Sequence, residues 1–332
     1  MATTAERTSV DAALSRAAEV LGAASDVALA CHVNPDPDAL GSMLALGLFL
    51  QARGTRVTCS WAQQPLELPR WAAGLEGLEL LVQPKAFPAE PDVMVALDTA
   101  SADRLGGLAA RAGKARECVV VDHHRTNPGF GTIVVLDPDA SSTCELVYRL
   151  TERIGGALPD GSAAWLYAGL LTDTGRFQYQ ATTPESLRVA AALREHDFDH
   201  ARLGQMLFED NSLGYLRALG IALARVVHMA DADLAWTYLT QADLAEAGAS
   251  MGETDDLIDV VRTAREADVT CVIKQQRDGR FKVSLRSKGA TNVGAVAAAF
   301  GGGGHRLAAG YTSDVGPEAS VEALVEALRA DG

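Results

Sequence analysis

Short apolar runs alternate with stretches of helical periodicity over the first two thirds of the chain. Short uncharged runs of this kind are typical of strands that are buried on both faces. Their alternation with helices predicts an α/β fold with a parallel sheet and helices on both of its faces. The predicted strands are Val27–Ala30, Arg56–Trp61, Val93–Leu97, Cys118–Val121 and Ile133–Leu136. The predicted helices cover 39–53, 104–112, 142–154, Ala163–Leu171 and Glu185–Glu195.

The pattern changes beyond residue 196. A helical pattern covers 197–228 and includes Leu213–Met229, and it is followed by a strand at Leu234–Leu239 and a helix near 254–265. Two alternating runs, Val269–Lys274 and Phe281–Arg286, flank an Asp-Gly turn that is typical of a hairpin. We therefore predict three parts, namely a first domain at 1–196, a helical connector at 197–229 and a smaller α/β domain at 230–332.

Length and composition favour a soluble globular protein. The 332 residues are 48% apolar and 22% charged, which suits two domains of ordinary size. Twenty-nine basic and 43 acidic residues give a formal charge of −14, so a long nucleic acid is not expected to bind along this surface. A polyanionic substrate is expected to be small, or to be bound by metal ions and a local basic patch.

Cysteine usage and the absence of targeting signals predict a cytoplasmic protein. The five cysteines form no Cys-x-x-Cys pair and lie in apolar runs, which indicates reduced and mostly buried thiols. The amphipathic pattern from Val10 to Leu21 lacks the features of a signal peptide. The uncharged runs are shorter than the ~20 apolar residues that a membrane-spanning helix needs. No membrane partner is expected.

One imidazole and two carboxylates lie close together after the first predicted strand. His32, Asp36 and Asp38 follow Val27–Ala30, and Pro35 and Pro37 prevent the strand from continuing. Open α/β sheets usually bind their ligands at this carboxyl end of the strands. Taken alone, Asp36 is equally consistent with a turn residue and Asp38 with a helix N-cap. Metal binding and local capping both remain open for this motif.

Three further motifs favour metal binding. Asp98 follows a strand, Asp122-His123-His124 ends another, and Asp173 lies where an apolar helix meets a turn. In a parallel sheet the carboxyl ends of neighbouring strands share one edge, so we expect these groups to converge. Their charges would be costly together without cations. Carboxylates and imidazoles without thiolates favour Mn²⁺, Mg²⁺ or Fe²⁺, and this many ligands suits two ions about 3.5–4 Å apart.

These motifs resemble those of a known superfamily. His32-x-x-x-Asp36-x-Asp38, Asp98, Asp122-His123-His124 and Asp173 look like the four motifs of the DHH phosphoesterases. Ser284–Lys288, Asn292-Val293 and Phe300–Gly310 are similar to the DHH-associated C-terminal domain, so that the resemblance covers nearly the whole chain from about residue 25. The resemblance extends to the branch of nanoRNases and cyclic di-AMP phosphodiesterases, which also remove the 3′-phosphate from pAp.

The resemblance implies a two-domain homodimeric enzyme with the active site in the cleft between the domains and Mn²⁺ as the usual activator. It implies that His32, Asp36 and Asp98 hold one ion, and that Asp38, Asp98, His123 and Asp173 hold the other. Asp98 would then bridge the ions. The resemblance further implies that His124 faces the scissile phosphate and that Asp122 orients its neighbours.

A local excess of basic residues marks the second domain. Between Arg262 and Arg306 there are nine Lys or Arg against three Asp or Glu, which alone is equally consistent with a solvated face. Gly301–Gly304 predict a backbone that can approach a ligand and offer N–H groups to an anion, or else a flexible turn after the helix Asn292–Ala299. With the resemblance, Arg286, Gly301, Gly302, Gly303, Gly304 and His305 are predicted to bind the end of the substrate that is not cleaved.

The preferred hypothesis is a two-metal phosphodiesterase acting on small nucleotides. Expected substrates are short oligoribonucleotides, pAp and cyclic di-AMP or pApA, with nucleoside monophosphates as products. One alternative is an inorganic pyrophosphatase, which shares the metal motifs but not the glycine-rich signature. The other is a nucleotide sensor without turnover, which predicts that metal ligands have been lost, whereas every motif is intact.

Overall fold

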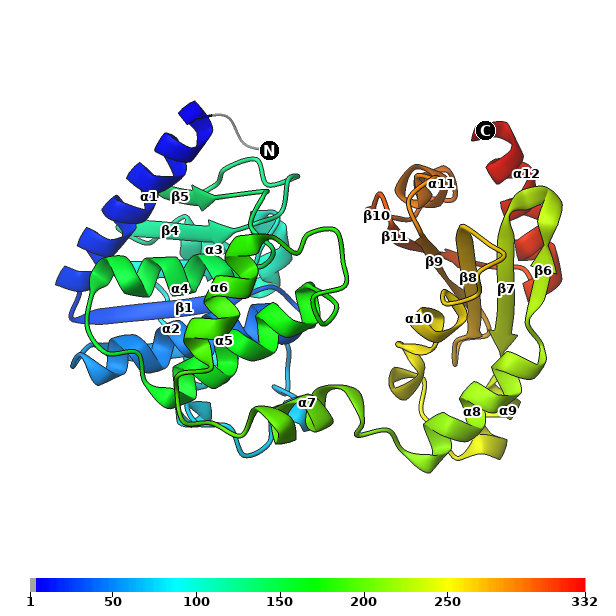
Figure 1. Cartoon of the computed structure of the whole chain (residues 1–332), viewed down its shortest axis with the longest axis horizontal. Helices are drawn as coiled ribbons and strands as arrows, with labels where there is room; N and C mark the ends of the chain where they lie inside the picture. The colour runs from blue at the N-terminus through cyan, green and yellow to red at the C-terminus, as the bar shows by residue number, and fades with distance from the viewer. Residues whose placement is uncertain (1–3, 332) are drawn as a thin grey trace. The chain divides into compact units, whose positions relative to one another are not determined.

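The computed structural model describes the backbone of residues 4–331 and the side chains of residues 9–304 and 306–329. The chain divides between Asp210 and Asn211 into two compact units, each with its own sheet (Figure 1). This division falls inside the predicted connector at 197–229. Helix α7 (His200–Phe208) belongs to the first unit, and α8 (Leu213–Ala224) belongs to the second.

The first unit contains a five-stranded sheet in the order β2-β1-β3-β4-β5, and every pairing is parallel. This confirms the predicted parallel sheet. The strands are β1 (Asp26–Cys31), β2 (Arg56–Ser60), β3 (Val93–Leu97), β4 (Glu117–Asp122) and β5 (Ile133–Leu136). The helices are α1 (Thr4–Ala23), α2 (Pro37–Ala52), α3 (Ala109–Ala112), α4 (Thr143–Ile154), α5 (Asp160–Asp173) and α6 (Pro184–Leu193).

Alternate residues of the central strands β1, β3 and β4 enter different cores on the two faces of this sheet. Leu29 and Val95 pack into a large core with α1, α2, α4 and α5, and Figure 1 shows α1, α4 and α5 on the same side of the sheet. Ala28 and Ala96 face a smaller core on the other side, which is covered by α3 and the 3₁₀ helix η4 (Ala102–Leu108). The central strands β1, β3 and β4 are therefore almost entirely apolar, because both of their faces are buried.

Local sequence explains where α2 begins and ends. Pro37 occupies the first helical position, where its missing N–H costs no hydrogen bond. Oδ1 of Asp36 caps the helix by accepting from the backbone N–H groups of Asp38 and Ala39 at 3.1 and 3.0 Å. Gly54, with a φ of 89°, follows the C-cap residue Arg53. Asp36 thus has the local structural role that was considered for it. The alternative that Asp38 caps α2 was wrong, because the N-cap residue is Asp36.

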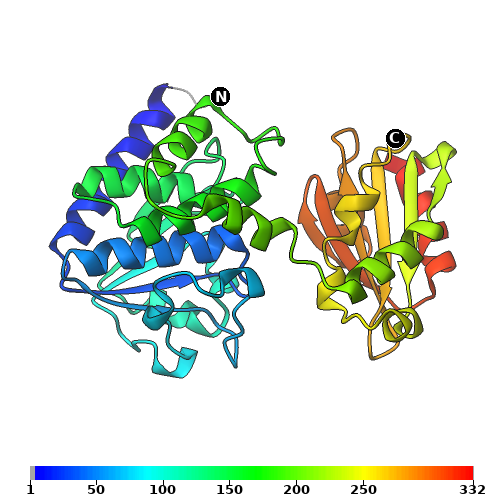
Figure 2. The same ribbon diagram turned by 60° about the horizontal axis from the view of Figure 1, so that its bottom comes forward.

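The second unit has a six-stranded mixed sheet in the order β10-β11-β9-β8-β7-β6. Its core on one face includes residues of α11 and α12, and its core on the other includes residues of α8, α9 and α10; Figure 2 shows α8 and α12 on opposite sides of the strands. The strands are β6 (Val227–Met229), β7 (Leu234–Leu239), β8 (Val269–Gln275), β9 (Phe281–Ser287), β10 (Gly303–His305) and β11 (Ala308–Ser313). The helices are α8, α9 (Gln241–Ala247), α10 (Leu257–Val261), α11 (Val293–Ala299) and α12 (Pro317–Asp331).

The structure confirms the hairpin and corrects the connector. β8 and β9 pair antiparallel around the predicted turn, where Gly279 has a φ of 88°. The prediction of a helix from Leu213 to Met229 was wrong at its end, because α8 stops at Ala224 and Val227–Met229 pairs with β7 as an edge strand. The β-branched pair Val226-Val227 favours this extended backbone.

The thiols of the chain are buried, and its helices can also be compared with the length that a membrane requires. All five cysteines are buried and unpaired, as predicted for structural thiols. Over residues 4–331 no helix combines the length and the apolar character that crossing a membrane requires.

Candidate metal centre

The structure brings the eight predicted residues of the first domain together at the carboxyl edge of the parallel sheet. His32 and Asp98 directly follow β1 and β3, and Asp122 ends β4 ahead of His123 and His124. Asp36 and Asp38 lie at the start of α2, and Asp173 is the last residue of α5. Three overlapping groups among them could hold a metal ion: Asp98 with His123 and His124, His32 with Asp36 and Asp98, and Asp38 with His123 and Asp173.

The first group to consider surrounds Nε2 of His32. This nitrogen lies 3.5 Å from Oδ2 of Asp98 and 3.6 Å from Oδ2 of Asp36. Nδ1 of His32 lies 2.8 Å from the carbonyl oxygen of Val33, to which it donates, so that Nε2 is the ring nitrogen that faces the carboxylates. Burial alone lowers the pKa of His32, but its hydrogen bonds with Asp36 and Asp98 raise it to about 10. The imidazole thus lies in a strongly negative environment.

The second group surrounds Nε2 of His123. This nitrogen lies 3.3 Å from Oδ2 of Asp173, 3.7 Å from Oδ1 of Asp98 and 3.9 Å from Oδ2 of Asp38. Nδ1 of His123 lies 3.4 Å from the carbonyl oxygen of Ala140, which again directs Nε2 toward carboxylates. Burial and the charge of Asp98 raise the pKa of Asp38 to about 7, even though His123 opposes the shift.

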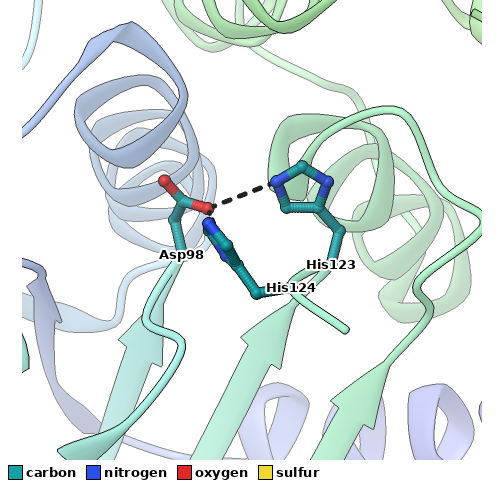
Figure 3. Close-up of side chains that lie close together, drawn as sticks. All are labelled: Asp98, His123 and His124. Carbon is teal, nitrogen blue, oxygen red and sulfur yellow. Dashed lines mark ion pairs between the residues drawn. The ribbon is translucent and has the colours of Figure 1, made fainter. Parts of the chain in front are cut away.

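Asp98 belongs to both groups. Its Oδ2 faces His32, whereas its Oδ1 lies 3.7 Å from Nε2 of His123 and 3.6 Å from Nδ1 of His124 (Figure 3). The residue is 2% exposed and has a φ of 52°, a left-handed conformation that is uncommon outside glycine and characteristic of functional sites. A carboxylate with this arrangement can bind two ions, one through each oxygen.

Asp122 has no exposed surface, and both of its carboxylate oxygens accept hydrogen bonds from the protein. Its Oδ1 accepts from Nδ1 of His124 at 2.7 Å and from the backbone N–H of His123 at 2.9 Å. Its Oδ2 accepts from Nδ2 of Asn127 at 2.6 Å. Burial raises the pKa of Asp122, but the hydrogen bond from His124 reverses this and lowers the pKa below its usual value. Asp122 is therefore held as a charged acceptor that fixes the orientation of the His124 ring.

Sequence reasoning missed two residues that hold carboxylates of the site, Asp122 and Asp98. Asn127 joins Asp122 to the backbone, because its Nδ2 also donates to the carbonyl of Thr99 at 3.0 Å. Thr143, the first residue of α4, donates from Oγ1 to Oδ1 of Asp98 at 3.0 Å. Asn127 could have been found from its position three residues after His124. Thr143 could have been found from the Ser-x-x-Glu capping pattern at Ser142–Glu145, which contains it.

The donor set fits divalent cations. Asp38 and Asp98 are 1% and 2% exposed, so that water screens their charges poorly. His32 and His123 both have Nδ1 directed at a backbone carbonyl, an arrangement typical of metal-binding imidazoles. The side chains of Asp36 and Asp173 are 53% and 28% exposed, which leaves one side of the cluster open to solvent. A small ligand can therefore reach the group from that side.

The predicted substrate-binding residues lie in the second unit. Arg286 is on β9, where it pairs in register with Ala308, and its Nε lies 3.5 Å from Oδ1 of Asp259. Gly303–His305 form the edge strand β10, which pairs with β11. The side chain of His305 lies outside the described residues.

The glycine run differs from the predicted open loop. The N–H groups of Gly301 and Gly302 donate to the carbonyls of Ala298 and Ala297, which end α11. Gly303 and Gly304 continue into a strand, and a Cβ atom at Gly304 would lie 2.5 Å from the carbonyl oxygen of Ala308. The N–H groups of Gly301 and Gly302 therefore already have acceptors within the protein, and contact of this run with a substrate stays a prediction. The glycines permit close pairing of β10 with β11.

Comparison with known proteins agrees with this architecture. Residues 26–170 match the DHH family, N-terminal domain, and residues 233–331 match the DHHA1 domain. A bifunctional oligoribonuclease and PAP phosphatase NrnA from Thermus thermophilus is 34% identical over 315 residues, covering 94% of this chain and 92% of that protein. The protein of the same name from Bacillus subtilis is 27% identical over 282 residues, covering 84% and 86%.

A solved structure extends the likeness to three dimensions. The crystal structure of an exopolyphosphatase-related protein from Bacteroides fragilis matches with a TM-score of 0.90 and 25% identity, over 96% of each chain. The resemblance noted in the sequence motifs is thereby confirmed at the level of the family. The chain belongs to the DHH family of metal-dependent phosphate-ester hydrolases, with a DHH domain followed by a DHHA1 domain.

Proposed function

We propose that the protein is a two-metal phosphodiesterase that hydrolyses small nucleotides. The observation that carries the proposal is the position of Asp98, whose two oxygens face two different imidazoles. One ion would be held by His32, Asp36 and Asp98, and the other by Asp38, Asp98, His123 and Asp173. Ions in these positions would supply Lewis acidity and an activated water to a phosphate ester, with Mn²⁺ favoured by the oxygen and imidazole ligands.

The chain's own residues would orient the phosphate and balance its charge. The hydrogen bond from Nδ1 of His124 to Asp122 places Nε2 on the side of the ring that points away from Asp122. We assign Nε2 of His124 to a non-bridging oxygen of the scissile phosphate, where a donor stabilises the charge that develops during hydrolysis. Asp122 keeps the ring in this orientation and does not itself contact substrate, because it has no exposed surface.

The substrate class follows from the relatives and from the second unit. The relatives are named for oligoribonucleotide and PAP hydrolysis, and we extend both activities and cyclic di-AMP or pApA hydrolysis to this chain. Arg286 on β9 is assigned to a phosphate of the part that is not cleaved, and Gly301–Gly304 with His305 to the neighbouring part of the nucleotide. The net charge of −14 disfavours long RNA, so we expect activity to fall steeply beyond a few nucleotides.

One hydrolysis series tests this proposal against its alternatives. Purified protein with Mn²⁺ is given pAp, pApA, cyclic di-AMP, a twenty-nucleotide RNA and pyrophosphate under identical conditions. The proposal expects AMP from the short nucleotides and little product from the long RNA. Phosphate released from pyrophosphate alone would indicate a pyrophosphatase, and tight nucleotide binding without any product would indicate a sensor. Equal rates on the two-nucleotide and twenty-nucleotide RNAs would contradict the expected length preference.

We also infer that the protein is a homodimer, as the sequence resemblance implies, and that it is cytoplasmic, as its cysteine usage indicates. Light scattering after gel filtration measures the mass directly, and fractionation of cells that produce the protein measures its location. A monomeric mass across the concentrations used for the hydrolysis series would contradict the dimer without affecting the proposed chemistry.

A further inference from the structure

We propose that the segment Ala140–Cys144 is the positioning element of the metal centre and that Thr143 sets the spacing between two of its carboxylates. This inference rests on the metal centre proposed above. The segment precedes and begins α4, and no motif of the sequence analysis includes it. It touches three candidate ligands that come from three other parts of the chain.

Thr143 makes two of these contacts through different atoms. Its Oγ1 donates to Oδ1 of Asp98 at 3.0 Å, and its backbone N–H donates to Oδ2 of Asp38 at 2.7 Å. Asp98 lies beside both His32 and His123, whereas Asp38 lies beside His123 alone. One residue therefore fixes the distance between the bridging carboxylate and a carboxylate of the second group.

The neighbours of Thr143 complete the arrangement. The backbone N–H of Cys144 donates to Oδ1 of Asp38 at 2.8 Å, so that hydrogen bonds to both oxygens fix the rotation of the Asp38 carboxylate. The carbonyl of Ala140 accepts from Nδ1 of His123 at 3.4 Å. Each carboxylate oxygen keeps a second lone pair for a cation. The positive end of the α4 dipole also favours a carboxylate at this position.

The segment is itself held by buried hydrogen bonds. Oγ of Ser142 accepts from the backbone N–H of Glu145 at 3.0 Å, which caps α4. Oε2 of Glu145 accepts from Oγ of Ser141 at 2.7 Å and from Oγ of Ser186 in α6 at 3.0 Å. Thr143 has no exposed surface, so it cannot touch a substrate and acts through the carboxylates that it holds.

The test measures Mn²⁺ binding to the metal-free full chain by calorimetric titration. Thr143→Val removes the hydroxyl while keeping the shape of the side chain, and we expect ~10–100-fold weaker binding at one site or both. The matched control is Thr151→Val on the same helix, where the buried hydroxyl donates only to the carbonyl of Tyr148. This control should bind Mn²⁺ as the wild type does.

A second pair of variants tests the same role if Thr143→Val does not fold. Thr143→Ser and Thr143→Ala both lack the methyl group and differ only in the hydroxyl, so serine should retain Mn²⁺ affinity and alanine should lose it. At saturating Mn²⁺, alanine should lower kcat for bis-p-nitrophenyl phosphate with little change in KM.

The outcomes of the titration distinguish the proposed metal centre from the proposed role of Thr143. If the wild type binds no Mn²⁺, the proposed metal centre is wrong and this inference falls with it. If the wild type binds Mn²⁺ and serine and alanine bind it equally well, the metal centre stands and the role of Thr143 is overturned. Equal loss in Thr151→Val would likewise overturn it, because the effect would then belong to helix stability.

Discussion

Nδ1 of His124 donates a hydrogen bond of 2.7 Å to Oδ1 of Asp122, a carboxylate with no exposed surface. Burial alone lowers the pKa of His124, but Asp122 reverses this and raises it. Both residues belong to the motif Asp122-His123-His124, but the side chain of His124 is 21% exposed whereas that of Asp122 is fully buried. A buried acceptor of this kind fixes both the tautomer and the orientation of the ring.

Asn127→Ala tests this dependence on a buried acceptor. Without Nδ2 of Asn127, Oδ2 of Asp122 loses a 2.6 Å hydrogen bond and the His124 ring becomes less well fixed. We expect kcat to fall by ~10–100-fold with little change in KM. Steady-state kinetics on bis-p-nitrophenyl phosphate provides the measurement. Asn211→Ala, an exposed change at the boundary of the two units, is the control, and an unchanged kcat in Asn127→Ala would contradict the argument.

Among substitutions that replace one carboxylate oxygen by an amide nitrogen, Asp98→Asn should cause the largest loss of activity. An amide oxygen cannot replace a charged carboxylate between two cations, so we expect kcat to fall by at least ~10³-fold. The melting temperature of the metal-free variant should not fall, because the charge of Asp98 disfavours the ionised form of Asp38. Asp92→Asn, just before the amino end of the same strand, is the matched control. A loss under tenfold would mean that Asp98 is not the bridge.

Removal of metal should abolish activity and destabilise only the first unit. A cation that binds the folded cluster and not the unfolded chain stabilises the fold by about 2.7 kcal/mol at one hundred times its Kd. Scanning calorimetry of the chelated protein, before and after Mn²⁺ is added back, should show an upward shift of the transition of residues 1–210. The transition of residues 211–332 is the internal control. Full turnover after exhaustive chelation would exclude a metal-dependent reaction.

Arg286→Ala should separate nucleotide binding from hydrolysis. Loss of a charge-assisted hydrogen bond to phosphate should cost roughly 1–3 kcal/mol on pApA, mostly through KM. Hydrolysis of bis-p-nitrophenyl phosphate, which has no distal nucleotide, should hardly change. Arg280→Ala, at the turn end of the same hairpin, is the control, since Arg280 pairs with Asp278. Equal losses on both substrates would instead give Arg286 a role in catalysis or folding.

The Arg225–Asp243 pair should make the second unit sensitive to acid. The Arg225 guanidinium, which donates to Asp243 at 2.6 and 2.8 Å, lowers the pKa of Asp243 to about 2. The unfolded chain has a pKa near 3.9 for Asp, so the stabilisation is complete above about pH 4 and disappears as the pH falls toward 2.

The variant Asp243→Asn measures this contribution. It should be on the order of 1–2 kcal/mol less stable than the wild type at pH 7, and most of this difference should be gone at pH 2. Urea unfolding across this pH range gives the difference directly. Asp278→Asn, which removes an exposed ion pair, should change stability little at any pH. A constant difference for Asp243→Asn between pH 7 and pH 2 would refute the role of its charge.

The strands of the first unit and the β8–β9 hairpin were predictable because their signals are local. Apolar runs and the Asp278-Gly279 turn are visible within a few residues of sequence. The edge strands β6 and β10 were missed because each has three residues, and β10 is mostly glycine and carries little side-chain pattern. Short edge strands depend on their partner more than on their own sequence.

The sequence predicted which residues form the candidate metal centre, but not the hydrogen bonds that hold them in place. Strand ends collect at one edge of a parallel sheet, so the meeting of Asp98 with Asp122-His123-His124 follows from topology. The role of Asp38 differs from the N-cap alternative because its oxygens accept from Thr143 and Cys144, more than one hundred residues later in the chain. No local pattern specifies such a contact, since it exists only after the sheet and α4 have packed together.

This long sequence separation has a consequence for the order of assembly. The candidate ligands extend from His32 to Asp173, and the contact from Thr143 to Asp38 spans 105 residues. During synthesis the chain grows from its N-terminus, so the full set of ligands cannot exist until α5 has left the ribosome. Non-local contacts of this kind form late in folding because loop closure precedes them. If the cluster binds a cation, its uptake would therefore report the packing of α4 and α5 against the paired strands.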